Sequence, residues 1–180
     1  SPDLPVASLN QAETMHTLKH YRPGSHAEQI VTELIITDNA AVSVETTLQQ
    51  LGIPVTVKRR MHWELSFGQD ISDDDQHAVR TAVHESGELY NSNKERLAAD
   101  QVEAGTWSLL VRERDDVIGL HALQALTGWF SVSGITSVRS GIIWDIAGND
   151  QPLTDELIQK VLDTHILMNP HAHKGYLYER

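Results

Sequence analysis

The chain has 180 residues and a formal net charge of −11, so nucleic acid is not expected as a partner, because phosphate binding requires clustered lysine and arginine. It contains no cysteine, which excludes disulfides, thiolate metal sites and cysteine nucleophiles. The mean hydropathy of −0.31, the lack of any apolar run of 18 residues and the lack of a secretory signal pattern predict a cytoplasmic protein without a membrane partner.

Residues 1–29 are expected to form a leader ahead of the folded units. Proline and glycine interrupt this stretch repeatedly, and its hydrophobic periodicity is weak. Its few apolar residues, which include Leu18 and Tyr21, predict no more than a short helical turn on the surface.

The first folded unit is expected over residues 30–100. It opens with a β-branched run typical of a strand, residues 30–36. Apolar residues at helical spacing follow and end at Gly52, a residue suited to a left-handed helix cap. Two strands then alternate in polarity on either side of Arg59 and Arg60, where we expect a tight turn.

The second half of this unit begins at Ser72. A serine followed by three aspartates is typical of a capped helix start, because the hydroxyl binds a free backbone N–H and acids favour the first turn. A short strand or loop through Leu97 closes the unit.

The second unit, over residues 106–180, repeats these features in the same order. The nine residues from Val138 match those from Val57, 81 residues earlier, in the positions of a valine, a base, a tryptophan, an acid and an aliphatic residue. A strand pair is again expected, here around a turn at Ser140 and Gly141, followed by a helix that starts near Thr154 and ends at Asn169-Pro170.

Each unit therefore has the predicted order β-α-β-β-α-β, which indicates an α+β fold of two ferredoxin-like repeats. A single antiparallel sheet with helices on one face leaves its other face bare. We expect the repeats to cover each other as a pseudo-dimer packed through their sheets, with Trp63 and Trp144 as the inter-repeat anchors.

Several of these segments resemble PurS, the small subunit of phosphoribosylformylglycinamidine synthase. Val138-Arg139-Ser140-Gly141 with the following apolar-apolar-acid-apolar run is similar to the family's V-R-x-G-K-x-x-E-I stretch. Asp115-Asp116-Val117-Ile118-Gly119 resembles the entry to its first helix, and Leu167-Met168-Asn169-Pro170 resembles the end of its second. The resemblance covers both PurS-like repeats, residues 30–100 and 106–180, and departs from the family at Ile142, where a lysine is usual.

The resemblance implies a non-catalytic component of an ATP- and glutamine-dependent amidotransferase in purine biosynthesis, without cofactors. Such a component bridges the glutaminase and synthetase parts and assists ammonia transfer. Its implied partners are those two subunits, and a homo-oligomer is compatible with it. The residues expected to contact a partner are Arg59, Arg60, Arg139, Gly141 and Asn169.

Histidines at two places in the chain could bind a metal or act in acid–base catalysis. His171 and His173 have the spacing of a metal pair on a strand, but no third ligand has a diagnostic spacing, so we expect a solvated loop and no metal site. His62 and Glu64 share one side of a strand and suggest acid–base catalysis, although an exposed surface pair is the simpler expectation, and no catalytic residue is assigned.

A duplicated ACT-like regulatory module that binds a small molecule between the repeats is the alternative function.

Overall fold

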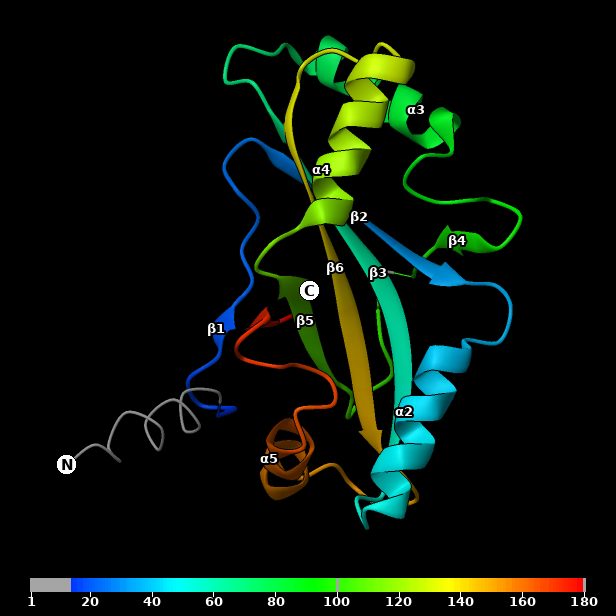
Figure 1. The fold of residues 1–180 in the computed structure, drawn as a ribbon, viewed down its shortest axis with the longest axis vertical. Helices are drawn as coiled ribbons and strands as arrows, with labels where there is room; N and C mark the ends of the chain where they lie inside the picture. The colour runs from blue at the N-terminus through cyan, green and yellow to red at the C-terminus, as the bar shows by residue number, and fades with distance from the viewer. Residues whose placement is uncertain (1–13, 100, 180) are drawn as a thin grey trace, which may run out of the picture.

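A computed structural model describes residues 14–99 and 101–179 of the chain as an α+β fold (Figure 1). Seven strands form one mixed sheet in the order β1-β7-β5-β6-β3-β2-β4. Four α-helices and one short π-helix accompany the sheet in these residues. None of the helices in this part of the chain has the length and apolarity required to cross a bilayer.

The elements fall into two successive halves. The first half contains β1 (Lys19–His20), β2 (Ala27–Leu34), α2 (Asn39–Gln50), β3 (Val55–Phe67), α3 (Asp73–Ser86) and β4 (Glu95–Leu97). The second half contains β5 (Trp107–Glu113), α4 (Val117–Gln124), the π-helix η1 (Ala125–Trp129), β6 (Ile135–Gly148), α5 (Asp155–Asp163) and β7 (His173–Leu177). After β1, each half follows the order strand, helix, strand, helix, strand.

Local sequence signals explain where the helices begin. Asp38, Ser72, Asp116 and Thr154 are the N-cap residues, and the side chain of each accepts a hydrogen bond from a backbone N–H of the first turn. The predicted starts at Ser72 and Thr154 are confirmed. Helix α5 ends at Asp163, before the predicted stop at Asn169-Pro170, and its last turn is followed by His165 in a left-handed conformation with φ 57°.

The predicted turns within the two strand pairs are wrong. Residues 55–67 form one continuous strand through Arg59 and Arg60, and residues 135–148 form another through Ser140 and Gly141. These two long strands pair with each other antiparallel along their length, from Val55 opposite Gly148 to Phe67 opposite Ile135. The pairing supplies backbone hydrogen bonds through the basic residues, so neither strand has a reason to turn there.

The prediction of two sheets packed through their faces is also wrong, because the two halves share a single sheet joined edge to edge at β3 and β6. The long middle strands of the two halves, β3 and β6, lie at the centre of the sheet. In each half the first strand (β2 or β5) lies beside the middle strand, and the third strand (β4 or β7) lies farther from the centre. An edge-to-edge junction satisfies the backbone groups of both central strands, which two separate sheets would leave as exposed edges.

The helices pack on one face of the sheet, which we call the helix face. Its core has two clusters, and each combines a helix from either half of the chain. In the first, Leu48 of α2 and Val161 of α5 pack with Trp144. In the second, Val83 of α3 and Ala122 of α4 pack with Trp63. The hydrophobic contact between the halves therefore runs through paired helices as well as through the central strands.

Part of the expected leader lies in the sheet. Strand β1 pairs parallel with β7, and the flanking side chains of Leu18 and Tyr21 are buried, with 8% and 5% of their surfaces exposed. The leader residues before position 14 lie outside the described residues. Strand β2 begins at Ala27, shortly before the expected start of the first folded unit.

Candidate functional site

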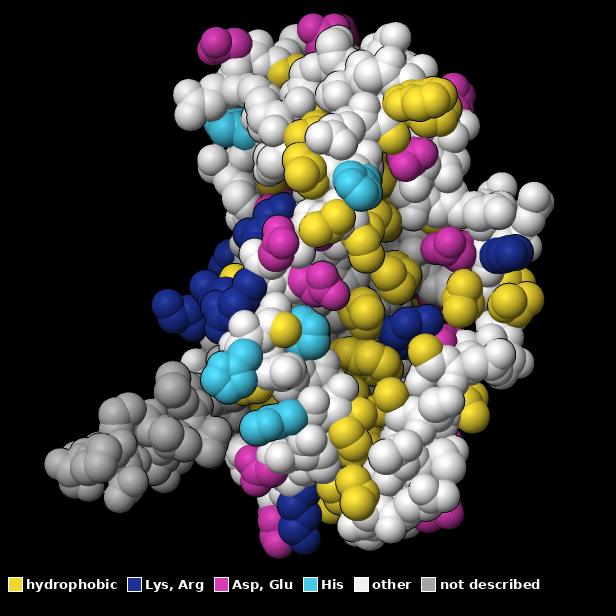
Figure 2. All heavy atoms as spheres, viewed as in Figure 1, with side chains coloured by type: hydrophobic (Ala, Val, Ile, Leu, Met, Phe, Trp, Pro, Cys, Tyr) yellow, Lys and Arg dark blue, Asp and Glu magenta, His cyan; other side chains and the backbone are white. Residues whose placement is uncertain are grey.

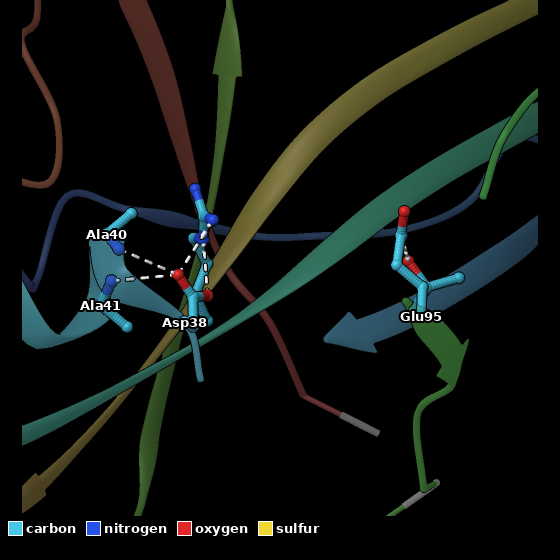
Figure 3. Close-up of polar contacts among 6 residues, drawn as sticks. Asp38, Ala40, Ala41 and Glu95 are labelled. Atoms are coloured by element: carbon cyan, nitrogen blue, oxygen red, sulfur yellow. Dashed lines mark hydrogen bonds and ion pairs between the residues drawn. The ribbon is translucent and has the colours of Figure 1, made fainter. Parts of the chain in front are cut away.

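Arg59 and Arg60 are adjacent in β3, so their side chains point to opposite faces of the sheet. Arg59 lies on the helix face, where its Nε and Nη2 donate to the Asp38 carboxylate at 2.9 and 3.0 Å. The same carboxylate caps α2 by accepting from the backbone N–H groups of Ala40 and Ala41 (Figure 3). Arg59 thus ties the start of α2 to the central strand.

Arg60 lies on the opposite face, which we call the network face. Its Nε and Nη2 donate to the two carboxylate oxygens of Asp145, both at 2.7 Å, and Ser108 Oγ donates to the same carboxylate at 2.6 Å. All three residues are at least nine-tenths buried. A bidentate pair between β3 and β6 with a third bond from β5 links both halves of the chain.

The remaining residues predicted to contact a partner do not gather with Arg59 and Arg60 in one site. Arg139 is exposed and lies opposite Glu64 in the strand register. Asn169 is exposed and shapes a turn, because its side-chain Oδ1 accepts from the His171 backbone and its own N–H donates to His173 Nδ1. No cluster of three metal-ligating side chains is found in the described residues.

Gly141 is buried inside β6 rather than at a turn. A Cβ atom at this position would lie 2.8 Å from Leu110 Cδ1 and 3.3 Å from Arg112 Cγ. These approaches are closer than ordinary van der Waals contact, so the glycine leaves the room that the stem of Arg112 occupies.

The network face carries a buried polar network that the sequence analysis did not anticipate. It comprises Tyr21, Gln29, Arg60, His62, Glu64, Ser108, Arg112, Asp145 and Tyr178. Gln29 Oε1 connects the network across strands, since it lies 2.9 Å from His62 Nε2 and accepts from the Tyr178 hydroxyl at 2.8 Å. The expectation of an exposed surface pair is wrong, because His62 has no exposed surface and Glu64 only 8%.

Tyr21 closes one end of this network. Its hydroxyl donates to Glu64, and Arg112 Nη2 lies 3.5 Å from the same carboxylate. The guanidinium of Arg112 also lies over the rings of Tyr21 and Tyr176, at 5.1 and 5.8 Å from their centroids. Burial and the neighbouring Glu64 raise the pKa of the Tyr21 hydroxyl well above its ordinary value.

Replacing Tyr21 with phenylalanine should flatten the alkaline loss of stability. A group whose pKa is raised by folding contributes stability that is present below its unfolded pKa, about 10 for tyrosine, and is lost as the pH rises above it. We expect the free energy of unfolding of Tyr21→Phe to decline less than that of the wild type above pH about 10. Urea titrations at stepped pH measure the slope.

Tyr176→Phe is the matched control for this pH dependence. Tyr176 lies on the same face, and its hydroxyl makes no hydrogen bond to a carboxylate among the described residues. Equal alkaline slopes for the wild type and Tyr21→Phe would show that Tyr21 does not control this loss of stability.

A cleft of about 260 Å³ opens beside Arg60 and is lined by residues of both halves and of the connecting segment, which lies between β4 and β5. We call it the junction cleft. Its charged and hydroxyl residues come from both halves and from the connecting segment, and include Glu33, Lys58, Arg60, Glu103, Thr106 and Asp145. Charged groups of both signs therefore face a space large enough for a small molecule.

The helix face exposes a hydrophobic surface. Figure 2 shows hydrophobic side chains gathered along the middle of this face, between the upper helices α3 and α4 and the lower helix α2. Helix α4, η1 and the residue that follows η1 add large apolar side chains that are 44–88% exposed. We call them the apolar ridge: Val117, Ile118, Leu120, Trp129 and Phe130. Exposed apolar side chains this dense are typical of a protein interaction surface.

No protein-family model matches the chain, and no curated protein matches its sequence.

The residues that sequence analysis missed carried a recognisable signal. In β5, Trp107, Leu109 and Val111 point to the helix face. The residues between them point to the network face, and they are Ser108, Leu110 and, next in the same alternation, Arg112. A serine and an arginine in the same phase of a strand indicate polar partners on that side of the sheet. No local pattern, however, indicates that Tyr21 reaches Glu64.

Proposed function

We propose that this chain is a PurS-like, non-catalytic scaffold of phosphoribosylformylglycinamidine synthase, made of two related repeats. In this role it bridges the glutaminase and synthetase parts of the amidotransferase and assists ammonia transfer between them. The observation that carries the proposal is the register of the central strands. Met61 lies directly opposite Ile142, and these residues are 81 positions apart.

This register supports two repeats related by a two-fold axis. Trp63 and Trp144, the residues that first suggested a repeat, are separated by the same 81 positions. When equivalent residues of two antiparallel strands face each other, a two-fold axis passes between them and relates the strands. The sequence offset and the hydrogen-bond register are independent observations that agree.

Charged pairs across the central strands follow the same relation. Glu64 lies opposite Arg139, and their equivalents Asp145 and Lys58 lie opposite each other. Each facing position thus combines an acid with a base, although the two acids make their ion pairs with Arg60 and Arg112 rather than with the facing bases.

The N-caps of the first helix in each half follow the same two-fold relation. Asp38 caps α2 and bonds to Arg59, whereas Asp116 caps α4 and accepts from the backbone N–H and hydroxyl of Ser140, at 2.8 and 2.5 Å. Arg59 and Ser140 are 81 positions apart, so in both halves the cap of the first helix binds the equivalent position of the long strand. This arrangement is expected of two copies of one unit.

The apolar ridge is the surface that we assign to a partner subunit. It belongs to only one of the two repeats, so it distinguishes their outer surfaces and suits a scaffold that contacts two different subunits. Most charged groups of the network face, by contrast, bind one another and stabilise the fold.

Capture experiments test the scaffold role. The immobilised chain should retain the glutaminase and synthetase subunits of the same host, and deletion of its coding sequence should cause purine auxotrophy. Ile118→Asp on the ridge should weaken capture by about tenfold or more. Leu51→Asp is the matched control. Leu51 is 59% exposed and Ile118 57%, and Leu51 is the C-cap residue of α2 and not part of the ridge.

Capture of neither subunit by the wild-type chain would overturn the proposal. Equal loss of capture in Ile118→Asp and Leu51→Asp would show that the ridge is not the contact surface.

A further inference from the structure

The two related halves differ at equivalent places on the network face. Glu64 and Asp145 are equivalent acids, and both are buried. Asp145 pairs with Arg60 of the adjacent strand β3, whereas Glu64 pairs with Arg112 of β5, which reaches it across β6. Around Glu64 the space is filled by Tyr21, whose hydroxyl binds the acid. Asp145 instead lines the junction cleft. A segment of the chain itself thus occupies one half and leaves the other open.

The wall of the junction cleft includes polar donors that the protein does not use. Arg60 is more than nine-tenths buried, and it donates to Asp145 through its Nε and Nη2. Its Nη1 group makes no hydrogen bond to any residue that the structure describes. Lys58 lies two residues earlier on the same face of β3 and makes no ion pair within the described residues. Two cationic donors beside one cavity form a site for a carboxylate.

The cleft also contains an acid without a cation. Asp145 is neutralised by Arg60, and Glu33 pairs with Arg96 at 2.9 Å. Glu103, on the connecting segment, has no ion pair to any residue that the structure describes. The cleft thus offers the base Lys58, the acid Glu103 and the Nη1 donors of Arg60. These groups match a ligand that carries one charge of each sign and is neutral overall. A dianion would instead be repelled by these acids and by the net charge of −11.

We propose that the junction cleft binds a small zwitterionic α-amino acid. Its carboxylate lies against Lys58 and the Nη1 group of Arg60, and its ammonium group faces Glu103. The volume of about 260 Å³ has room for an amino acid with a short polar side chain. This site goes beyond the scaffold role and does not depend on it, because it lies on the face opposite the apolar ridge.

Titration calorimetry with the full chain tests this inference. The probes are glycine, L-alanine, L-serine and L-glutamine, with acetate, ethylamine and inorganic phosphate as single-charge or purely anionic comparisons. At least one amino acid should bind saturably below about 10 mM, and acetate or ethylamine should bind about tenfold more weakly or not at all. Lys58→Met and Glu103→Gln should each weaken the amino acid by about tenfold.

Arg139→Met is the matched control, because Arg139 is the strand equivalent of Lys58, is also exposed and does not line the cleft. It removes the same charge and should leave binding unchanged. The inference is overturned if no amino acid binds below about 10 mM, if phosphate binds more tightly than every amino acid, or if Arg139→Met weakens binding as much as Lys58→Met does. Subunit capture by Lys58→Met, which should equal that of the wild type, separates this outcome from a failure of the scaffold proposal.

Discussion

Replacing Trp144 with alanine is expected to lower the free energy of unfolding by about 3–5 kcal/mol. Trp144 lies on the helix face of β6 with 7% of its surface exposed, in a cluster with Leu48 of α2 and Val161 of α5. Truncation would remove the buried indole and leave a cavity between two helices from different halves of the chain. The urea midpoint, measured with the slope of the transition, reports this loss.

Trp129→Ala is the control for this substitution. Trp129 is 88% exposed at the end of η1, so the same change of side chain should alter stability by no more than about 0.5 kcal/mol. An unchanged midpoint in Trp144→Ala would mean that the indole does not hold the two helices to the sheet.

Replacing Asp145 with alanine is expected to cost about 3–5 kcal/mol for a different reason. Asp145 accepts two hydrogen bonds from Arg60 and one from Ser108. Only 7% of the surface of Arg60 is exposed. Removal of Asp145 would therefore leave the Arg60 guanidinium poorly solvated and without a counter-charge. Because an uncompensated buried charge is the main cost, the effect should exceed that of losing three hydrogen bonds between neutral groups.

A double variant distinguishes these causes. Arg60→Met combined with Asp145→Leu removes the whole charge pair and restores apolar volume, and such replacements are often close to neutral. The double variant should therefore be more stable than Asp145→Ala alone when both are measured by urea unfolding. Equal destabilisation of the two would sink the explanation by buried charge and would favour loss of packing.

The two predictions probe opposite sides of one strand. Trp144 and Asp145 are consecutive residues of β6, so one faces the helices and the other faces the polar network. Destabilisation by both would show that the central sheet depends on its contacts on both faces, as expected for a sheet that joins two related halves. It would also show that the network face is a structural surface, on which the junction cleft is a local opening.

The amino-acid sequence by itself predicted most elements and their order. Strand alternation in β3, β5 and β6 and the caps at Ser72 and Thr154 are local signals, and the structure follows them. The offset of 81 residues between matching motifs also needed no coordinates, although its structural counterpart is the register of the central strands.

Local signals did not separate a hairpin from one long strand. Polarity alternates with a period of two residues in either case, so the basic residues Arg59 and Arg60 resembled a turn between two short strands. The presence of an antiparallel partner, β6, decided the matter by pairing with the backbone of β3 throughout. Pairing partners are distant in sequence and leave no local trace.

Burial on the network face was likewise decided only by the tertiary structure. His62 and Glu64 have the composition of an exposed surface, but Tyr21 from the segment before β2 and Tyr178 from the end of the chain pack over them. Tyr21 thus covers Glu64, whereas its equivalent Asp145 lines the junction cleft. A sequence specifies which side chains share a strand face through its period of two, whereas the cover on that face depends on contacts between residues far apart in the chain, which only the folded chain brings together.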